Sequence, residues 1–353
     1  MVTQSVGIGI VGSGLMGQTY AEIAARHHHN AHLAAVAGGR RAAALAARYG
    51  VGCEPSVEHL IGRTDVDAVI ITTPEATHLG ITRLAAAARK HVLVEKPMAP
   101  DVAQCEAMDH ACRAAGVVLM VVQSQRFRGV NRRAKRLLDE GAIGALWQVR
   151  CCSLIPLEAT LDVVRERPWM SGTGNGGTFL SQTVHSFDLL RWLAGSEAQR
   201  IFAFSRAYGD HALSDLSTMA QVEFASGVMA QLWASYEMPG MGLPQSRFRF
   251  QLVGEKGALD FDGYSSLDLV QDGAAVRVWE QQPFDALDPL DPVRLESFTA
   301  QNQAFVDAVV NGTRPPVTAE DGRAAVELCQ AALQSARTGD VVRLPLGVLN
   351  LEF

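Results

Sequence analysis

Short apolar runs alternate with helix-like segments along the first third of the chain. The apolar runs are rich in valine and isoleucine and carry few polar residues, which is typical of strands buried on both faces. Strands that alternate with helices predict right-handed crossovers and a parallel sheet covered by helices. The expected strands cover residues 6–11, 32–37, 68–72, 92–94 and 117–122, and the expected helices cover 18–26, 41–49, 77–89 and 101–116.

The pattern changes after residue 123. Many later segments alternate polar with apolar residues, as strands of an antiparallel sheet with one solvent-exposed face do. Expected strands cover 146–154, 200–208, 218–224, 228–235, 248–253 and 258–261, expected helices cover 131–140, 178–192, 301–311 and 318–336, and loops are expected at 155–167 and 237–246. A chain of 353 residues also exceeds one ordinary core. We therefore predict an α/β protein with two domains, residues 1–123 and 124–353.

Composition removes several classes of protein. The net charge of -6 argues against a nucleic-acid or acidic-membrane partner, because both require a basic face. No apolar run reaches the roughly 18 residues that a membrane helix requires. The six cysteines include no CxxC pair, and the run His27–His29 fans out around a helix end, so we expect no metal site. These features predict a reduced, cytoplasmic protein with no nucleic-acid or membrane partner.

A glycine-rich loop follows the first predicted strand and opens a helix. In this position the first glycine can make a tight turn, the second lets the backbone approach a pyrophosphate, and the third allows close helix packing. The unpaired N–H groups of the helix N-terminus attract the anion. A simple turn is the alternative. The residues expected to bind a dinucleotide here are Gly12, Ser13, Gly14, Leu15, Met16 and Gly17.

The end of the second predicted strand bears on the choice of dinucleotide. Sites specific for NAD usually carry an Asp or Glu there, which accepts hydrogen bonds from the ribose 2′-hydroxyl. Here the strand runs into Gly39, Arg40 and Arg41, and guanidinium groups suit a 2′-phosphate. We predict a preference for NADP(H), with NAD(H) as the alternative if the arginines only begin a solvated helix.

Two further strand ends should meet at the nicotinamide, since ligands of an open parallel sheet bind beyond the carboxyl ends of its strands. Lys96 could donate a hydrogen bond to an alcohol or carbonyl oxygen while hydride moves. The alternative is a structural ion pair with Glu95, although neighbouring strand residues point to opposite faces. The residues expected at these strand ends are Thr72, Thr73, Pro74, Glu95 and Lys96.

Five motifs together resemble the glucose–fructose oxidoreductase / inositol dehydrogenase / MocA family over the whole chain. They are GSGLMG (12–17), DVDAVIITTPEATH (65–78), EKP (95–97), GNGGTFLSQTVHSFDLLRWLAG (174–195) and AFVDAVVNGTRPPVTAEDGRAAVEL (304–328). The resemblance implies an N-terminal Rossmann domain and a C-terminal α/β domain with a large, mostly antiparallel sheet. That sheet often forms the subunit interface, so a homodimer or homotetramer is expected. The implied reaction is reversible oxidation of a sugar or cyclitol hydroxyl with NAD or NADP.

The resemblance also implies roles for particular residues. Lys96 matches the catalytic lysine of the EKP motif, and Thr73, Pro74 and His78 match positions that line the nicotinamide ribose. His185 matches the general acid/base that acts on the substrate hydroxyl.

One position departs from the family pattern. The family has an Asp four residues before the histidine, and Ser181 stands there in this chain. Residues four apart share a helix face, so Ser181 can bond the substrate or His185, but it brings no charge to raise the histidine pKa. Gln182 adds a second neutral hydrogen-bonding group, and Asp188 either orients His185 or is solvated.

Arg126 and Trp169 are further candidate substrate residues. Arg126 could hold a substrate hydroxyl or an anionic group, or form an interdomain ion pair. Trp169 could pack on the nicotinamide or a sugar face, or belong to the core.

The sequence thus predicts an NAD(P)-dependent oxidoreductase that acts on a small carbohydrate-like hydroxyl or its ketone. In this hypothesis Lys96 polarises the reacting oxygen and His185 exchanges its proton. One alternative is a nicotinamide-dependent glycosidase with tightly bound cofactor. Another is a cofactor-binding regulator that has lost its catalysis, an interpretation to which Ser181 gives weight but against which Lys96 and His185 argue.

Overall fold

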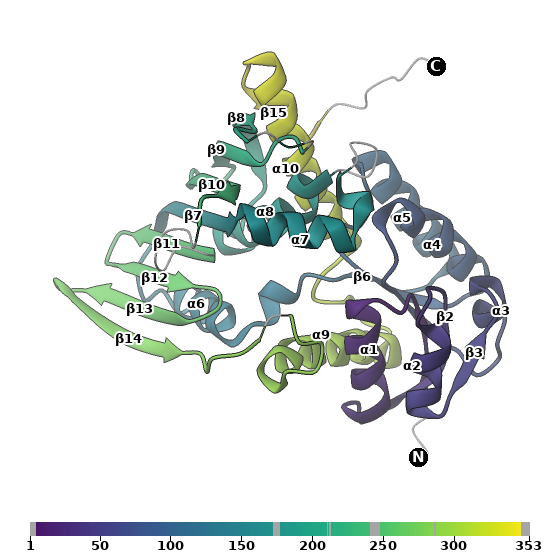
Figure 1. Cartoon of the computed structure of the whole chain (residues 1–353). Coiled ribbons are helices and arrows are strands. Elements are labelled where there is room, and N and C mark those ends of the chain that lie inside the picture. The colour runs from purple at the N-terminus through teal and green to yellow at the C-terminus, as the bar shows by residue number, and fades with distance from the viewer. Residues whose placement is uncertain are drawn as a thin grey trace. The chain divides into compact units, whose positions relative to one another are not determined.

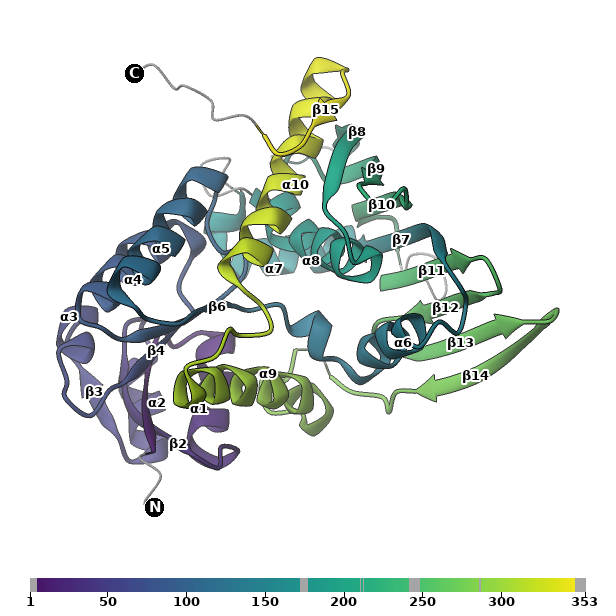
Figure 2. The same ribbon diagram turned by 180° about the vertical axis from the view of Figure 1, so that it is seen from behind.

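The computed structural model describes residues 5–171, 177–209, 211, 213–240, 248–285 and 287–346. The chain forms two compact units (Figures 1 and 2). The first contains residues 1–127 and 283–323, and the second contains 128–282 and 324–353. The first break lies close to the predicted boundary at 123, whereas residues 283–323 join the first unit.

A six-stranded parallel sheet forms the centre of the first unit. The strand order is β3-β2-β1-β4-β5-β6, the doubly wound order of a Rossmann fold. Its strands are β1 (Val6–Val11), β2 (Ala31–Ala37), β3 (Gly52–Glu54), β4 (Ala68–Ile71), β5 (His91–Val94) and β6 (Leu119–Val121). Strands β1 and β4 are buried along their whole length, which explains their continuous apolar sequence.

Helices cover both faces of this sheet. They are α1 (Leu15–Arg26), α2 (Ala42–Tyr49), α3 (Val57–Ile61), α4 (His78–Ala87), α5 (Val102–Ala115) and α9 (Pro292–Asn311), with the short helices η1 (Glu75–Thr77) and η2 (Ser124–Phe127). Helices α4 and α5 pack together on one face, and α1 and α9 pack together on the other (Figure 2). Asp291 caps α9 by accepting from the N–H groups of Val293 and Arg294, so this helix begins nine residues before the predicted start.

The second unit is built on a nine-stranded sheet of order β14-β13-β12-β11-β7-β10-β9-β8-β15. Only the β7–β10 pair is parallel among the strand pairs described. The strands are β7 (Leu146–Pro156), β8 (Ala198–Arg206), β9 (Ser217–Phe224), β10 (Met229–Met238), β11 (Phe248–Gly254), β12 (Ala258–Asp262), β13 (Ser266–Gln271), β14 (Ala274–Glu280) and β15 (Val342–Arg343). The predicted fold class is confirmed.

Helices pack on one face of this larger sheet. They include α6 (Gly129–Asp139), α7 (Leu157–Glu166) and α8 (Gly177–Ala194). The short helix η3 (Pro168–Ser171) packs against α8. Helix α10 (Ala319–Thr338) begins in the first unit and ends in the second. The covered face carries one row of fully buried side chains in direct register across seven strands. That row is Ala203, Ala220, Leu232, Cys151, Phe250, Phe261 and Leu267.

One predicted element of the second unit is wrong, because the segment 155–167 contains helix α7 instead of a loop. Strands β13, β14 and β15 of this unit were not predicted. Part of the expected loop at 237–246 lies outside the described residues. The first four residues of β14 are all exposed, and its sequence AAVRVWE lacks the regular alternation of polar and apolar residues that predicts a strand.

Candidate functional site

The glycine-rich loop connects β1 to α1 and is fixed by close backbone contacts. Gly12 has φ of +108°, and a Cβ added there would lie 2.5 Å from Oγ1 of Thr72. A Cβ on Gly17 would lie 2.2 Å from the carbonyl oxygen of Gly12. Both positions therefore require glycine in the folded protein.

Gly14 differs from these two glycines because nothing lies within 4 Å of its added Cβ. It is exposed, and it precedes α1 without a side-chain cap. Leu15 and Met16, both half-buried, begin the helix, and no side chain at the N-cap accepts from its first N–H groups. Open space at an uncapped helix N-terminus suits the pyrophosphate of a dinucleotide.

The turn after β2 packs on this loop. Gly38 and Gly39 have positive φ angles of 79° and 83°, and a Cβ on Gly39 would lie 2.4 Å from the buried Oγ of Ser13. The same hydroxyl accepts a hydrogen bond of 3.1 Å from the N–H of Arg41. The side chains of Arg40 and Arg41 are exposed beside the loop, and the strand ends in Ala37 without a carboxylate.

The ends of β4 and β5 lie side by side, as predicted from the sequence. Ile71 and Val94 form the last pair of the two strands, and the N–H of Glu95 donates to the carbonyl oxygen of Ile71 at 2.9 Å. The hydroxyl of Thr72 donates to the carbonyl oxygen of Val11 at 3.0 Å, and that of Thr73 contacts the Thr77 hydroxyl at 2.7 Å. Thr72 therefore holds β4 to β1, while Thr73 and Pro74 are half-buried at the strand end.

His78 connects the two strand ends. It is 1% exposed, and its ring nitrogens lie 2.9 Å from the carbonyl oxygen of Thr73 and 3.1 Å from that of Met98. Burial lowers the pKa of His78, and the two carbonyl groups oppose this shift. These contacts shape the loops, and a contact with the nicotinamide ribose stays a prediction.

A buried carboxylate precedes Lys96. Glu95 is 7% exposed and accepts hydrogen bonds from the Tyr20 hydroxyl at 2.6 Å and from the backbone N–H of Lys96 at 3.1 Å. Burial raises the pKa of Glu95, and the positive charge of Lys96 opposes the shift. Lys96 itself is half-buried. No sequence motif predicts the hydrogen bond between Tyr20 and Glu95.

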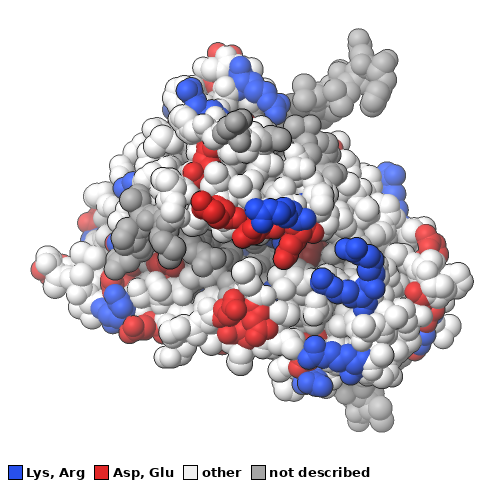
Figure 3. All heavy atoms as spheres, in the orientation of Figure 1, with Lys and Arg blue, Asp and Glu red and all other residues white. Residues whose placement is uncertain are grey.

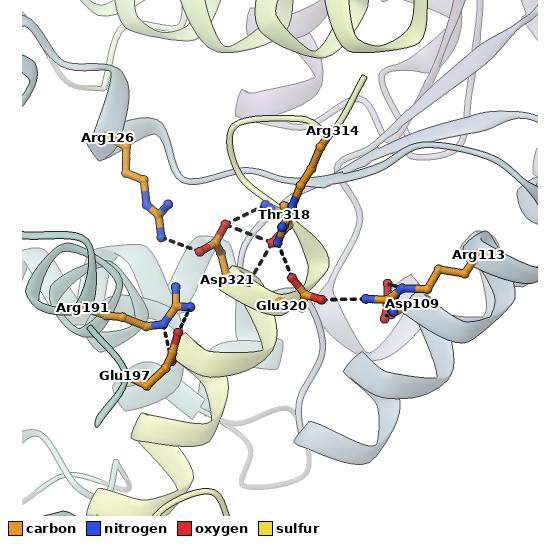
Figure 4. A network of polar contacts seen from close by, with 9 residues as sticks. All are labelled: Asp109, Arg113, Arg126, Arg191, Glu197, Arg314, Thr318, Glu320 and Asp321. Atoms are coloured by element: carbon orange, nitrogen blue, oxygen red, sulfur yellow. Dashed lines mark hydrogen bonds and ion pairs between the residues drawn. The ribbon is translucent and has the colours of Figure 1, made fainter. Parts of the chain in front are cut away.

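Arg126 forms an ion pair in the first unit. Its Nη2 lies 3.2 Å from Oδ1 of Asp321, and the other carboxylate oxygen of Asp321 accepts from the N–H of Thr318 at the start of α10 (Figure 4). Glu320, next in the helix, pairs with Arg113 and Arg314. The ion pair lies inside one unit and is not the predicted interdomain pair. Substrate binding by Arg126 stays a prediction.

The remaining candidates belong to the second unit. Ser181, Gln182 and His185 lie on α8, with Ser181 buried and the other two half-buried. Half-buried Trp169 lies on η3, which packs against α8. The glycine-rich segment 172–176 lies outside the described residues.

Asp188, one turn further along α8, is 1% exposed, so the expectation of a solvated side chain is wrong. Lys96 and His185 belong to different units, and their meeting over one substrate carbon stays a prediction.

Across the described ranges, no group of three His, Cys, Asp or Glu residues is arranged to hold a metal ion. In the same part of the chain, no helix is long and apolar enough to cross a membrane. On the face shown in Figure 3, patches of Lys and Arg alternate with patches of Asp and Glu.

Both units match known family models. Residues 6–123 match "Oxidoreductase family, NAD-binding Rossmann fold", and residues 131–260 match the GFO/IDH/MocA C-terminal domain. The chain is 30% identical to 1,5-anhydro-D-fructose reductase from Ensifer adhaerens, over 87% of this chain and 89% of that protein. It is 27% identical to inositol 2-dehydrogenase from Rhizobium meliloti (strain 1021), over 94% of this chain and 97% of that protein.

A solved structure gives the same picture. The crystal structure of scyllo-inositol dehydrogenase from Lactobacillus casei with NAD(H) and scyllo-inositol has a TM-score of 0.79 and 25% identity, and covers 96% of this chain and 99% of that one. The chain therefore belongs to the Gfo/Idh/MocA oxidoreductase family. The predictions of a nicotinamide-dependent oxidoreductase and of its Rossmann domain are confirmed.

Two glycine substitutions separate folding from cofactor binding. Gly17→Ala forces a methyl group against the Gly12 carbonyl, so we expect a loss of about 1 kcal/mol or more in the free energy of unfolding. Gly14→Ala meets open space, so its stability should change by less than about 1 kcal/mol. Gly14→Ala should weaken dinucleotide binding roughly tenfold or more, because the added methyl group keeps the pyrophosphate away from the backbone N–H groups. Losing one charged hydrogen bond in this way costs about 1.5 kcal/mol.

Urea unfolding and calorimetric titration with both dinucleotides measure these effects. Unchanged affinity in a folded Gly14→Ala protein would contradict a pyrophosphate site at this loop.

Proposed function

We propose that this protein interconverts a ring hydroxyl of a cyclitol or sugar and the corresponding ketone. The position of Lys96 carries the proposal: a half-buried amine stands at the carboxyl end of β5, in the sheet whose β1–α1 loop suits a dinucleotide. The related inositol dehydrogenase and anhydrofructose reductase, whose names refer to a cyclitol and a sugar, support this substrate class.

Each residue has a defined task in this reaction. A bound nicotinamide supplies the acceptor or donor of hydride. Lys96 in its ammonium form donates a hydrogen bond to the reacting oxygen, which polarises a ketone and stabilises the oxygen of an alcohol as its proton leaves. His185 takes that proton during oxidation and returns it during reduction. Ser181 and Gln182 offer neutral hydrogen bonds to the other hydroxyl groups of the substrate.

Replacing either proposed catalytic side chain should lower turnover without unfolding the protein. We expect Lys96→Met and His185→Ala each to reduce kcat by about 10² or more, the range that a positioned acid or base contributes. A steady-state panel of cyclitols, sugars and glycosides, assayed with both cofactors, measures this.

The matched control is His110→Ala, because His110 is an exposed histidine on α5. Its kcat should equal that of the wild type. Near-native turnover by folded His185→Ala would remove the imidazole from the mechanism.

We further propose a preference for NADP(H) over NAD(H). The support is the pair of exposed guanidinium groups, Arg40 and Arg41, beside the Ser13 loop, and the absence of a carboxylate at Ala37, where β2 ends. The Lactobacillus casei enzyme was solved with NAD(H), so NAD(H) is the alternative.

Removing both arginines tests the cofactor preference. In the double variant Arg40→Ala/Arg41→Ala, kcat/KM for NADP should fall about tenfold or more, since each charged hydrogen bond contributes about 1.5 kcal/mol or more. The value for NAD should change little. A wild-type protein with a higher kcat/KM for NAD would overturn the proposal.

The face of the large sheet opposite the helices supports the proposal of a homo-oligomer. Phe204 and Met219 are in register on β8 and β9, and both are more than half exposed, at 59% and 53%. Half-buried Trp233 and buried Cys152 continue this row onto β10 and β7, so the exposed part of the row lies on β8 and β9. An exposed apolar row across a sheet is typical of a protein–protein interface. We propose that two or more copies associate through this face, in a reducing compartment such as the cytoplasm, where the six free cysteines stay reduced.

A charge placed in this row should separate the subunits. We expect sedimentation velocity to show a dimer or tetramer for the wild type and a smaller species for Phe204→Glu, because a carboxylate cannot be buried there without a partner. Val310→Glu changes an exposed valine on α9 and should leave the assembly intact. A monomeric wild type would contradict the interface.

A further inference from the structure

Glu75 is a buried carboxylate that the sequence motifs do not explain. It begins η1 directly after Pro74, and only 5% of the residue is exposed. Its Oε1 atom is buried and accepts no hydrogen bond from any residue that the structure describes. Buried carboxylates are costly unless a positive charge or a donor compensates them, so this side chain needs a partner.

The fold places Glu75 beside Lys96. The register of β4 with β5 pairs Ile71 with Val94, so the segment that ends in Glu75 runs next to the segment that contains Lys96. His78 fixes the two segments through the carbonyl groups of Thr73 and Met98. The positive charge of Lys96 acts on the Glu75 carboxylate in this arrangement.

Two buried carboxylates share the charge of one lysine. Burial raises the pKa of Glu75 and the Lys96 charge lowers it, as is also the case for Glu95. Both oxygens of Glu95 already accept hydrogen bonds, from the Tyr20 hydroxyl and the Lys96 N–H. Oε1 of Glu75, in contrast, has no hydrogen-bond donor among the described residues, so it is available to attract the ammonium group of Lys96.

Other charged or titratable groups face this cluster from the surrounding elements of the first unit. Tyr20 on α1 and Arg294 on α9 act on Glu95, and His78 on α4 lies between the strand ends with a lowered pKa caused by burial. Tyr20 is fully buried and its pKa is raised by burial, so it stays neutral near pH 7. Glu75 and Glu95 are thus the negative charges that act on Lys96 within this set.

We propose that Glu75 is a positioning residue that keeps Lys96 protonated and directed at the reacting oxygen. This inference rests on the proposed function of Lys96. The positive charge of an oxidised nicotinamide favours deprotonation of a nearby lysine, and an adjacent carboxylate offsets that effect. The ammonium form donates a stronger, charge-assisted hydrogen bond than a neutral amine, and its positive charge stabilises a developing alkoxide.

The pH dependence of ketone reduction tests the proposal. Reduction needs protonated Lys96, so kcat/KM falls as pH rises through the lysine pKa. Removing the negative charge lowers that pKa, so Glu75→Gln should move the alkaline limb to lower pH by about one unit or more. Glu75→Asp keeps the charge and should restore most of the wild-type profile. Glu58→Gln, an exposed acid on α3, is the control and should not shift the limb.

A titration without turnover separates this proposal from the proposed function. Reductive methylation with ¹³C-formaldehyde gives each lysine a dimethylamine NMR signal that shifts as the amine titrates. The chain contains four lysines, at positions 90, 96, 135 and 256, so the signal of Lys96 can be assigned by its loss in Lys96→Arg. We expect this signal to titrate at lower pH in Glu75→Gln than in the wild type. A shifted titration in a protein that reduces no ketone would support the Glu75–Lys96 coupling while the proposed function fails.

The opposite result overturns the inference alone. If the wild type reduces ketones, and Glu75→Gln leaves both the alkaline limb and the Lys96 titration unchanged, Glu75 is only a structural acid. If Glu75→Gln does not fold, Glu75→Met takes its place, because methionine is neutral, of similar length and suited to a buried position. A Met variant with an unchanged Lys96 titration would overturn the proposal.

Discussion

The burial of charge at the carboxyl ends of β4 and β5 is the constraint on which the site depends. These strands run through the centre of a sheet covered on both faces, where an unpaired charge would be costly. Polar chemistry is therefore confined to the residues directly after the strands, and Glu75, Glu95 and Lys96 stand there. The two acids remain buried because the ammonium group and the Tyr20 hydroxyl compensate their charge.

The same edge of the sheet also fixes the nucleotide loop. Gly12 turns against Thr72 at the end of β4, and Gly17 packs on Gly12, so the loop has little freedom to move relative to the strand ends. His78 adds a connection between the segments after β4 and β5. Reacting groups held this closely lose little entropy when substrate binds, which is the physical basis of preorganised catalysis.

The sequence predicts elements whose signal is local. The strands β1, β2, β4 and β5 were placed within about one residue because apolar runs end at glycine, proline or charge. Strand β3 was missed because it has three residues and little burial, and the start of α9 was missed because its cap is one aspartate in a polar stretch. The motifs predict catalytic roles for Lys96 and His185, but the Tyr20–Glu95 bond joins residues 75 apart, and no local pattern reveals such a pair.

Isotope transfer tests the proposed hydride transfer between a ring carbon and the nicotinamide most directly. Cyclitols and sugars deuterated at their ring carbons are incubated with the purified protein and NADP, with NAD in a parallel reaction, and the mass of the reduced cofactor is measured. We predict that one deuterium atom moves from a ring carbon to the nicotinamide. Reduced cofactor that contains no deuterium from any of these substrates, in a protein that binds the dinucleotide, would contradict this chemistry.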